Sequence, residues 1–200
     1  MAKDNVETEL KLYVPFLNAV ARKIEAAGGK LSAPRVLERN VRYDNAAGDF
    51  AASNTTLRLR MDTRARLTYK DGERLLGQYG SSRFEEEVEI SDFEKMETIL
   101  GKLGFHQMLV YEKYRTTYQL EGAEVTLDEM PYGNFVEIEG EQAAIGRVLD
   151  ALQLHDAHRM KSSYVVLFGI VKKNLGLTFD DLTFANFKGI AVPESAFNGG

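Results

Sequence analysis

The stretch VETELKLYV, residues 6–14, places two carboxylates and an ammonium group on one side of an extended chain. Successive side chains of a strand point to opposite faces, so Glu7, Glu9 and Lys11 share one face while apolar residues such as Leu10 share the other. Such a charged face can be solvated surface, or it can hold a ligand. Clustered carboxylates suit a hard divalent cation, and an ammonium group suits a phosphate oxygen.

The same arrangement recurs along the chain. Further stretches with period-2 alternation carry charged residues on one face, and with the first stretch they supply seven basic and seven acidic groups. Opposing basic and acidic walls are what a metal-bound polyphosphate requires, because basic groups bind phosphate oxygens and carboxylates bind a bridging cation. The basic groups are Lys11, Arg58, Arg60, Lys70, Arg83, Lys113 and Arg115. The acidic groups are Glu7, Glu9, Glu85, Glu87, Asp128, Glu137 and Glu139.

Eight strands and four amphipathic helices are predicted as the elements that position these faces. The predicted strands span residues 5–13, 35–44, 55–62, 66–71, 81–91, 110–120, 123–130 and 134–140. The predicted helices span residues 15–27, 92–103, 141–153 and 162–174.

An ordinary half-exposed antiparallel sheet gives the same alternation in each single strand. The recurrence of both signs across nearly the whole sheet favours another arrangement. We predict an α+β fold in which the eight strands close into an antiparallel barrel, with the helices packed outside. The charged faces then line a tunnel, which must hold water, metal or a polyanion because dry burial of so many charges is prohibitive.

Composition bounds the class of protein. The 200 residues are 44% hydrophobic and 28% charged, as in a globular protein, and we predict a single domain over 1–200. Within it, residues 175–200 form a C-terminal extension that the pattern does not place. There are no cysteines, which excludes disulfides and thiolate chemistry, and the net charge of −5 argues against a nucleic-acid-binding surface. The longest apolar run, residues 164–171, is too short to span a membrane, so no membrane partner is expected. The absence of cysteine fits a cytoplasmic location, and a monomer or homodimer is expected.

The motif ETELK, Glu7 to Lys11, resembles the Glu-x-Glu-x-Lys signature of CYTH domains, also called triphosphate tunnel metalloenzymes. Later blocks resemble this family in the same order: TLRLR, LTYK, RFEEE, YEKYR, VTLDEM, GNFVEIEG and KSSY. The resemblance covers roughly residues 5–170. It implies a tunnel that binds a triphosphate together with magnesium or manganese, as in the class IV adenylate cyclase and thiamine triphosphatase branches.

The resemblance also implies roles for individual residues. Catalytic roles are expected for Glu7, Glu9 and Lys11. Metal ligands are expected at Glu7, Glu9, Asp128, Glu137 and Glu139, with Glu87 as an alternative to Asp128. Contacts to the triphosphate are expected from Lys11, Arg58, Arg60, Lys70, Lys113, Arg115 and Lys161. For Lys161 a solvated helix start is an equal alternative, and Arg83 with Glu85 could instead be an ion pair that shapes the wall.

Three functions stay open at this stage. Hydrolysis of inorganic tripolyphosphate, thiamine triphosphate or nucleoside triphosphates is favoured, because RNVRYD lacks the histidine and aromatic pattern of the bacterial cyclase branch. Cyclisation of ATP to cyclic AMP is the alternative, and a nucleoside pocket for it is sought first in residues 42–54. A non-catalytic sensor of polyphosphate or nucleotides is the third.

Other candidate motifs are weaker. His155 and His158 flank Asp156 and could suggest a metal pair, but they follow a predicted helix and lie outside the strands, so a surface or structural role is expected. The GGK at 28–30 lacks the strand-to-helix context of a phosphate-binding loop.

Overall fold

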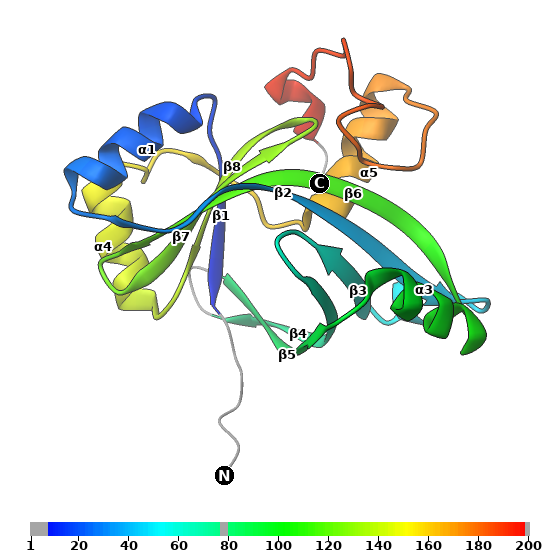
Figure 1. Cartoon of the computed structure of the whole chain (residues 1–200). Helices are drawn as coiled ribbons and strands as arrows, with labels where there is room; N and C mark the ends of the chain where they lie inside the picture. The colour runs from blue at the N-terminus through cyan, green and yellow to red at the C-terminus, as the bar shows by residue number, and fades with distance from the viewer. Residues whose placement is uncertain (1–7, 77–79, 199–200) are drawn as a thin grey trace.

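The computed structural model of the chain describes residues 8–76 and 80–198, with the backbone alone for residues 72–76 and 80–83. One large sheet forms the body of the molecule, and its two longest strands arch across it (Figure 1). The strands are β1 (Glu9–Tyr13), β2 (Lys30–Asn45), β3 (Thr56–Met61), β4 (Ala65–Leu76), β5 (Gly80–Ile90), β6 (Phe105–Leu120), β7 (Ala123–Met130), β8 (Gly133–Glu139) and β9 (His158–Arg159).

The predicted closed barrel of eight strands is wrong. The described residues form a sheet of nine strands in the order β5-β4-β3-β2-β6-β7-β8-β1-β9. All neighbours are antiparallel, and no described hydrogen-bonded pairing joins β5 to β1. The C-terminal end of the outer edge of β1 pairs with β9 instead. Leu12 and Tyr13 pair with β9, and the Met160 N–H donates to the Lys11 carbonyl at 2.9 Å. The eight predicted strands all occur, whereas β9 is too short to produce an alternation.

Within residues 8–76 and 80–198, five α-helices and one 3-10 helix accompany the sheet. The four predicted helices occur at the expected places, and the short α2 and η1 were not predicted. They are α1 (Leu17–Ala26), α2 (Asp49–Ala52), α3 (Phe93–Lys102), α4 (Gln142–Leu152), α5 (Tyr164–Leu175) and the 3-10 helix η1 (Glu194–Phe197). Among the described residues, no helix is long and apolar enough to cross a membrane.

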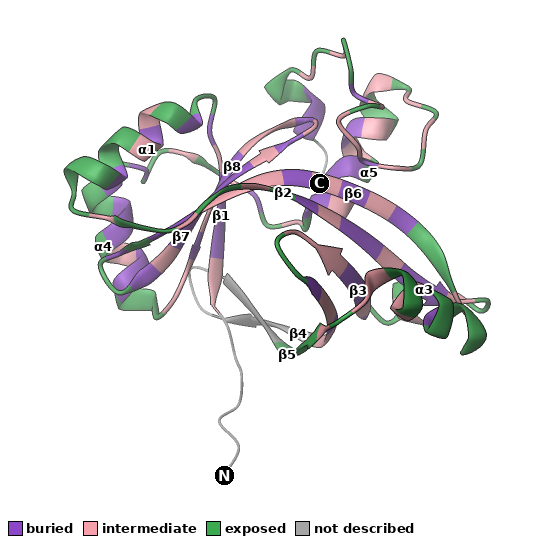
Figure 2. Ribbon diagram, in the orientation of Figure 1, coloured by how far each residue is buried: buried purple, intermediate pink, exposed green. Residues whose placement is uncertain are grey.

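Helices α1, α4 and α3 cover parts of the outer face of the sheet, whereas α5 packs against one end of the inner, charged face (Figures 1 and 2). Helices α1 and α4 lie side by side over β7, β8 and β1, where Ile24, Ile145 and Leu149 are fully buried. Helix α3 covers a smaller cluster around Leu59, and α5 covers a third cluster rich in aromatic residues. Because the apolar side chains under α1, α4 and α3 point outward, the alternation turns the charged side chains to the concave face, where α5 closes one end.

The chain turns sharply after α1, and glycine is required there. The Gly29 N–H donates to the Ile24 carbonyl at 2.8 Å, which ends the helix. A Cβ atom at Gly29 would lie 2.3 Å from Ile24 Cγ2, so any larger residue would displace a fully buried core side chain. This turn sends the chain into β2, the strand that spans the sheet.

The C-terminal segment, which the sequence did not place, packs along β6. Strand β7 pairs with β6 only from Tyr114 onward. Before Tyr114, the backbone of Leu182 forms hydrogen bonds with β6: its carbonyl accepts from the Glu112 N–H and its N–H donates to the Val110 carbonyl, each at 2.9 Å. Phe187 and Phe197 are buried with the aromatic cluster beneath α5. The segment therefore covers the edge of β6 that β7 leaves unpaired.

Candidate active site

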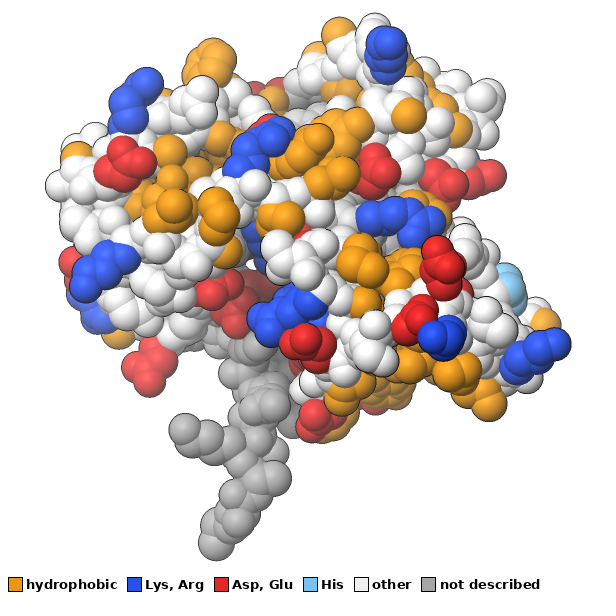
Figure 3. Space-filling view, viewed as in Figure 1, with side chains coloured by type: hydrophobic (Ala, Val, Ile, Leu, Met, Phe, Trp, Pro, Cys, Tyr) orange, Lys and Arg blue, Asp and Glu red, His pale blue; other side chains and the backbone are white. Residues whose placement is uncertain are grey.

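The concave face of the sheet borders a cavity of about 430 Å³. Strands β1 to β6, strand β8 and the start of α5 contribute to its wall. Acidic and basic side chains gather beside one another around the hollow at the centre of the face in Figure 3. Eleven residues predicted from the sequence line it: Glu9, Lys11, Arg58, Arg60, Lys70, Glu85, Lys113, Arg115, Glu137, Glu139 and Lys161.

The charge of this cavity is opposite to that of the whole chain. Its described lining includes eight basic and four acidic side chains, an excess of four positive charges, whereas the chain carries a net charge of −5. Of the remaining predicted residues, Asp128 and Glu87 do not line it. Glu7 and the side chain of Arg83 lie outside the described residues.

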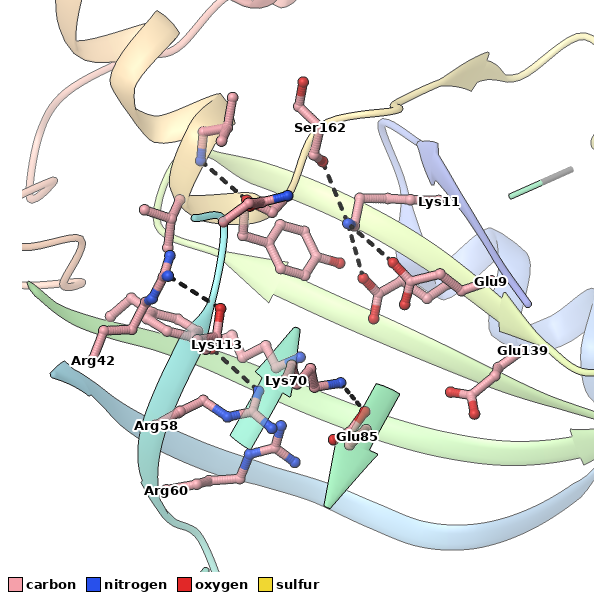
Figure 4. A pocket seen from close by; sticks show the side chains of 18 of the residues that line it. Glu9, Lys11, Arg42, Arg58, Arg60, Lys70, Glu85, Lys113, Glu139 and Ser162 are labelled. Atoms are coloured by element: carbon pink, nitrogen blue, oxygen red, sulfur yellow. Dashed lines mark hydrogen bonds and ion pairs between the residues drawn. The ribbon is translucent and has the colours of Figure 1, made fainter. Parts of the chain in front are cut away.

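Antiparallel register brings the lining residues together. Lys11 lies opposite Glu137 and Glu9 opposite Glu139 on β1 and β8, while Lys70 of β4 lies opposite Glu85 of β5. Figure 4 shows Glu9 and Glu139 on one side of the cavity and Arg58 and Arg60 on the other, with the Lys70–Glu85 ion pair between the strands. The carboxylates of β1 and β8 thus face the guanidinium groups of β3.

Lys11 is held charged although its side chain is buried. Its Nζ lies 3.2 Å from Glu137 Oε1, 4.0 Å from Glu9 Oε1 and 4.4 Å from the centre of the Tyr164 ring. Burial lowers the pKa of Lys11, but Glu137 and Glu9 outweigh burial and raise it above its ordinary value. For Glu137, burial likewise disfavours the charged form, and Lys11 and Arg115 hold its pKa well below the usual range.

Asp128 lies behind the basic residues and is fully buried. Lys113 Nζ donates to it at 3.0 Å, Arg115 Nε at 2.7 Å and the Tyr164 hydroxyl at 2.8 Å, and Arg115 Nη2 makes a further bond. Burial disfavours a charged Arg115, but Asp128 and Glu137 raise its pKa well above the ordinary value. The carboxylate of Asp128 is therefore committed to positioning two cations and a phenol.

The two arginines of β3 lie close together. Arg58 donates to the Tyr111 hydroxyl at 3.3 Å and to Thr68 Oγ1 at 3.2 Å, and Arg60 donates to Asn40 Oδ1 at 3.1 Å. Burial, followed by the neighbouring charge of Arg58, lowers the pKa of Arg60 from its ordinary value. Two like charges crowded on a buried wall favour binding of an anion, which would relieve their repulsion.

We predict that Arg60→Gln weakens tripolyphosphate binding by about tenfold, the scale of one charge-assisted contact, without lowering the melting temperature of the empty protein. The variant removes an anion contact and the 3.7 Å pairing with the buried Glu38, but it also removes the crowding with Arg58, and Glu38 keeps Lys113 as a partner at 3.6 Å. Thermal melts with and without tripolyphosphate measure both effects. Arg66→Gln is the control, because Arg66 is ion-paired with Asp62 and does not line the cavity: it should lower the melting temperature and leave affinity intact. A lower melting temperature in Arg60→Gln, together with weaker binding in Arg66→Gln, would contradict the crowding of Arg58 and Arg60.

Several lining residues were not predicted from the sequence. Tyr111 shares the face of Lys113 and Arg115, and its position in that alternation was the signal that could have found it. Arg42 and Asn54, the ends of the segment named for a nucleoside pocket, both line the cavity, and Arg42 Nη2 donates to Thr56 Oγ1 at 3.1 Å. The start of α5 contributes Ser162, Ser163, Tyr164, Val165 and Val166.

The histidines lie away from this cavity. His155 Nε2 is 2.7 Å from Asp150, and His158 Nδ1 is 3.2 Å from Glu194 of η1, so each pairs with a surface carboxylate. In the described parts of the chain, no three histidine or carboxylate side chains converge in a preformed metal cluster.

Comparison with known proteins gives one consistent family. A model of the CYTH domain matches residues 5–164. A Methanocaldococcus jannaschii protein, named provisionally as an adenylate cyclase, is 28% identical over 177 residues, which cover 82% of this chain and 99% of that protein.

Solved structures agree. PH1819 from Pyrococcus horikoshii is 28% identical, with a TM-score of 0.67 over 81% of this chain and 97% of that one. HpAC1 from Hippeastrum, described as a provisional adenylyl cyclase with a dominant triphosphatase activity, is 23% identical, with a TM-score of 0.61 over 82% and 94% of the two chains. The resemblance noted in the sequence is confirmed, and the chain belongs to the CYTH-domain family.

Proposed function

We propose that this protein is a divalent-metal-dependent triphosphatase whose substrate binds in the charged cavity. The observation that carries the proposal is the excess of four positive charges among the described lining residues of a chain with net charge −5. A chain of linked phosphates has the high negative charge that such a wall would bind most strongly.

The basic residues would bind the phosphate oxygens. Arg58, Arg60 and Lys70 would contact one side of the triphosphate, and Lys113 and Arg115, positioned by Asp128, would contact another. The start of α5 would add backbone N–H groups, because Ser163 caps that helix at the cavity wall and helix N-termini favour phosphate. Lys161 precedes this cap on the same wall.

The residues present fit a divalent cation that binds together with the substrate. Magnesium is commonly held by one or two carboxylates plus substrate phosphates and water, so a preformed cluster of three ligands is not needed. Glu9 and Glu139 are cross-strand partners on the cavity wall and are the proposed ligands, with Glu137 beside them and Glu7 preceding Glu9 in the motif. A bound cation would neutralise charge on the phosphate oxygens.

Accordingly, Glu139→Gln should raise the magnesium concentration needed for half-maximal phosphate release by about tenfold or more, since a neutral amide replaces one hard anionic ligand. Glu121→Gln is the matched control, because Glu121 lies in the β6–β7 turn and pairs with Arg147 at the surface. Metal titrations of both variants, with circular dichroism for the fold, measure the effect. Equal magnesium requirements in the two variants would remove Glu139 from the metal site.

Adenylate cyclase activity is the second candidate. Arg42 and Asn54 line the cavity and could contact a nucleoside, and the Methanocaldococcus jannaschii relative carries a cyclase name. Hydrolysis remains the first choice because the cavity wall is dominated by groups that recognise phosphates. Cyclisation would also require a ribose hydroxyl held in line with the α-phosphate.

A side-by-side assay decides between these reactions. The purified protein is incubated with tripolyphosphate or ATP in magnesium and in manganese, and phosphate, pyrophosphate and cyclic AMP are measured. We expect phosphate release from tripolyphosphate with a kcat/KM at least comparable to that for ATP. Conversion of ATP to cyclic AMP with tripolyphosphate left intact would replace the triphosphatase by the cyclase. Tight binding of tripolyphosphate without any product would indicate a sensor.

A further inference from the structure

Two phenols line the cavity, and their surroundings differ. The Tyr164 hydroxyl donates to Asp128 Oδ2 at 2.8 Å. Burial, then the charges of Asp128 and Glu137, raise the pKa of Tyr164 well above its ordinary value. The proton of Tyr164 is therefore held by the network behind the basic residues.

Tyr111 has the opposite surroundings. Its ring is buried, with 8% of the residue exposed, and its hydroxyl oxygen accepts a hydrogen bond from Arg58 Nη1 at 3.3 Å. Within the described part of the chain, this hydroxyl has no acceptor for its own hydrogen. Burial raises the pKa of Tyr111, but Arg58, Arg60 and Lys113 outweigh burial and lower it.

The groups around Tyr111 come from several elements. Its cross-strand partner on β2 is the neutral Asn40, and the tail contributes the apolar Leu182 beside its backbone. The titratable and charged groups on this part of the wall are Arg58 and Arg60 of β3, Lys113 of β6, Glu38 of β2 behind them, Glu85 of β5 and Tyr132 after β7. Arg58 contacts the phenol, and Arg60 and Lys113 on the same wall add positive charge, so the three cations would stabilise the phenolate left by loss of its proton.

We propose that Tyr111 is the general acid of the triphosphatase, donating its phenolic proton to the oxygen that leaves phosphorus. This rests on the proposed function. In the step, water attacks a terminal phosphorus, the bond from that phosphorus to the bridging oxygen breaks, and its electron pair and the Tyr111 proton go to the bridging oxygen. One proton of the attacking water passes to solvent, and the phenolate regains a proton from solvent. When two groups of the same kind have environments that shift their pKa values in opposite directions, as for Tyr111 and Tyr164, one typically acts as the acid and the other has a structural role.

The test compares Tyr111→Phe with Tyr114→Phe in the full-length chain. Tyr114 lies on the same strand but outside the cavity, where its ring stacks on the Arg35 guanidinium at 3.5 Å. Loss of a general acid should lower kcat for tripolyphosphate by about 10²-fold, the low end of the usual range, with KM nearly unchanged. The fall of wild-type kcat at high pH should also disappear in Tyr111→Phe, while Tyr114→Phe keeps wild-type kinetics.

A conservative variant keeps the test informative if Tyr111→Phe fails to fold. Fluorotyrosine incorporated at position 111 has a more acidic phenol, so the high-pH fall of kcat should move to lower pH. An increase in KM with unchanged kcat and pH profile would mean that Tyr111 only positions Arg58, and would overturn the proposal. If the wild type releases phosphate and Tyr111→Phe releases it equally fast, only the inference about Tyr111 is overturned. If the wild type releases no phosphate, the proposed triphosphatase function and this inference are both overturned.

Discussion

Asp128→Asn is expected to destabilise the protein by about 3–5 kcal/mol, the usual cost of removing one partner from a buried ion pair. The carboxylate is fully buried and accepts hydrogen bonds from Lys113, Arg115 and Tyr164. An amide of the same size leaves the buried Lys113 and the partly buried Arg115 with less compensating charge and places a donor against donors. Urea unfolding followed by circular dichroism measures the change in the free energy of unfolding.

Glu129→Gln is the control for this experiment. Glu129 is the next residue along β7, on the opposite face, and pairs with Arg35 at the surface, where 37% and 51% of the two side chains are exposed. Surface pairs of this kind contribute about 0–1 kcal/mol, so the control should unfold almost like the wild type. Similar stabilities for the two variants would mean that Asp128 does not hold the basic wall together.

Arg58→Ala should weaken tripolyphosphate binding by roughly 10- to 150-fold, which corresponds to about 1.5–3 kcal/mol for one charge-assisted contact. Arg58 lies on the cavity wall, and its guanidinium is oriented by Tyr111 and Thr68. Because the Arg58 guanidinium is already oriented in the empty protein, it loses little conformational entropy when the anion binds. Titration calorimetry with tripolyphosphate and magnesium gives the dissociation constant.

The matched control is Arg64→Ala. Arg64 lies in the turn between β3 and β4 and pairs with Glu89 at the surface, with 58% of its side chain exposed. It carries the same charge, so a purely long-range effect would weaken binding similarly in both variants. Wild-type affinity in Arg58→Ala, or equal losses in both variants, would place the triphosphate away from β3.

The sequence predicted the strands and the lining residues because both depend on the same local alternation. A residue that alternates with apolar neighbours on a helix-covered strand must face the other side of the sheet, and this applies to Lys11, Arg58 and Glu137 alike. The alternation does not indicate how deeply a side chain on that face is buried. Asp128 has the inward phase but lies behind Lys113 and Arg115, which the pattern of β7 alone cannot reveal.

Closure of the sheet could not be predicted because it depends on which strand reaches the outer edge of β1. At Leu12 and Tyr13 that edge pairs with His158 and Arg159, a two-residue strand with no periodicity. Tyr111 was missed because the faces were assigned from charged side chains alone, although Tyr111 continues the charged face of β6. The contact of Leu182 with β6 joins residues far apart in the chain, which local patterns do not specify.

The most direct test of the account is a crystal structure with tripolyphosphate and manganese. We predict one triphosphate chain in the cavity, with phosphate oxygens bonded to Arg58, Lys113 and Arg115, and an anomalous manganese peak between the phosphates and the carboxylates of Glu9 and Glu139. Triphosphate and manganese bound elsewhere on the protein, with the cavity holding only solvent, would contradict the central claim that this cavity is a triphosphate site.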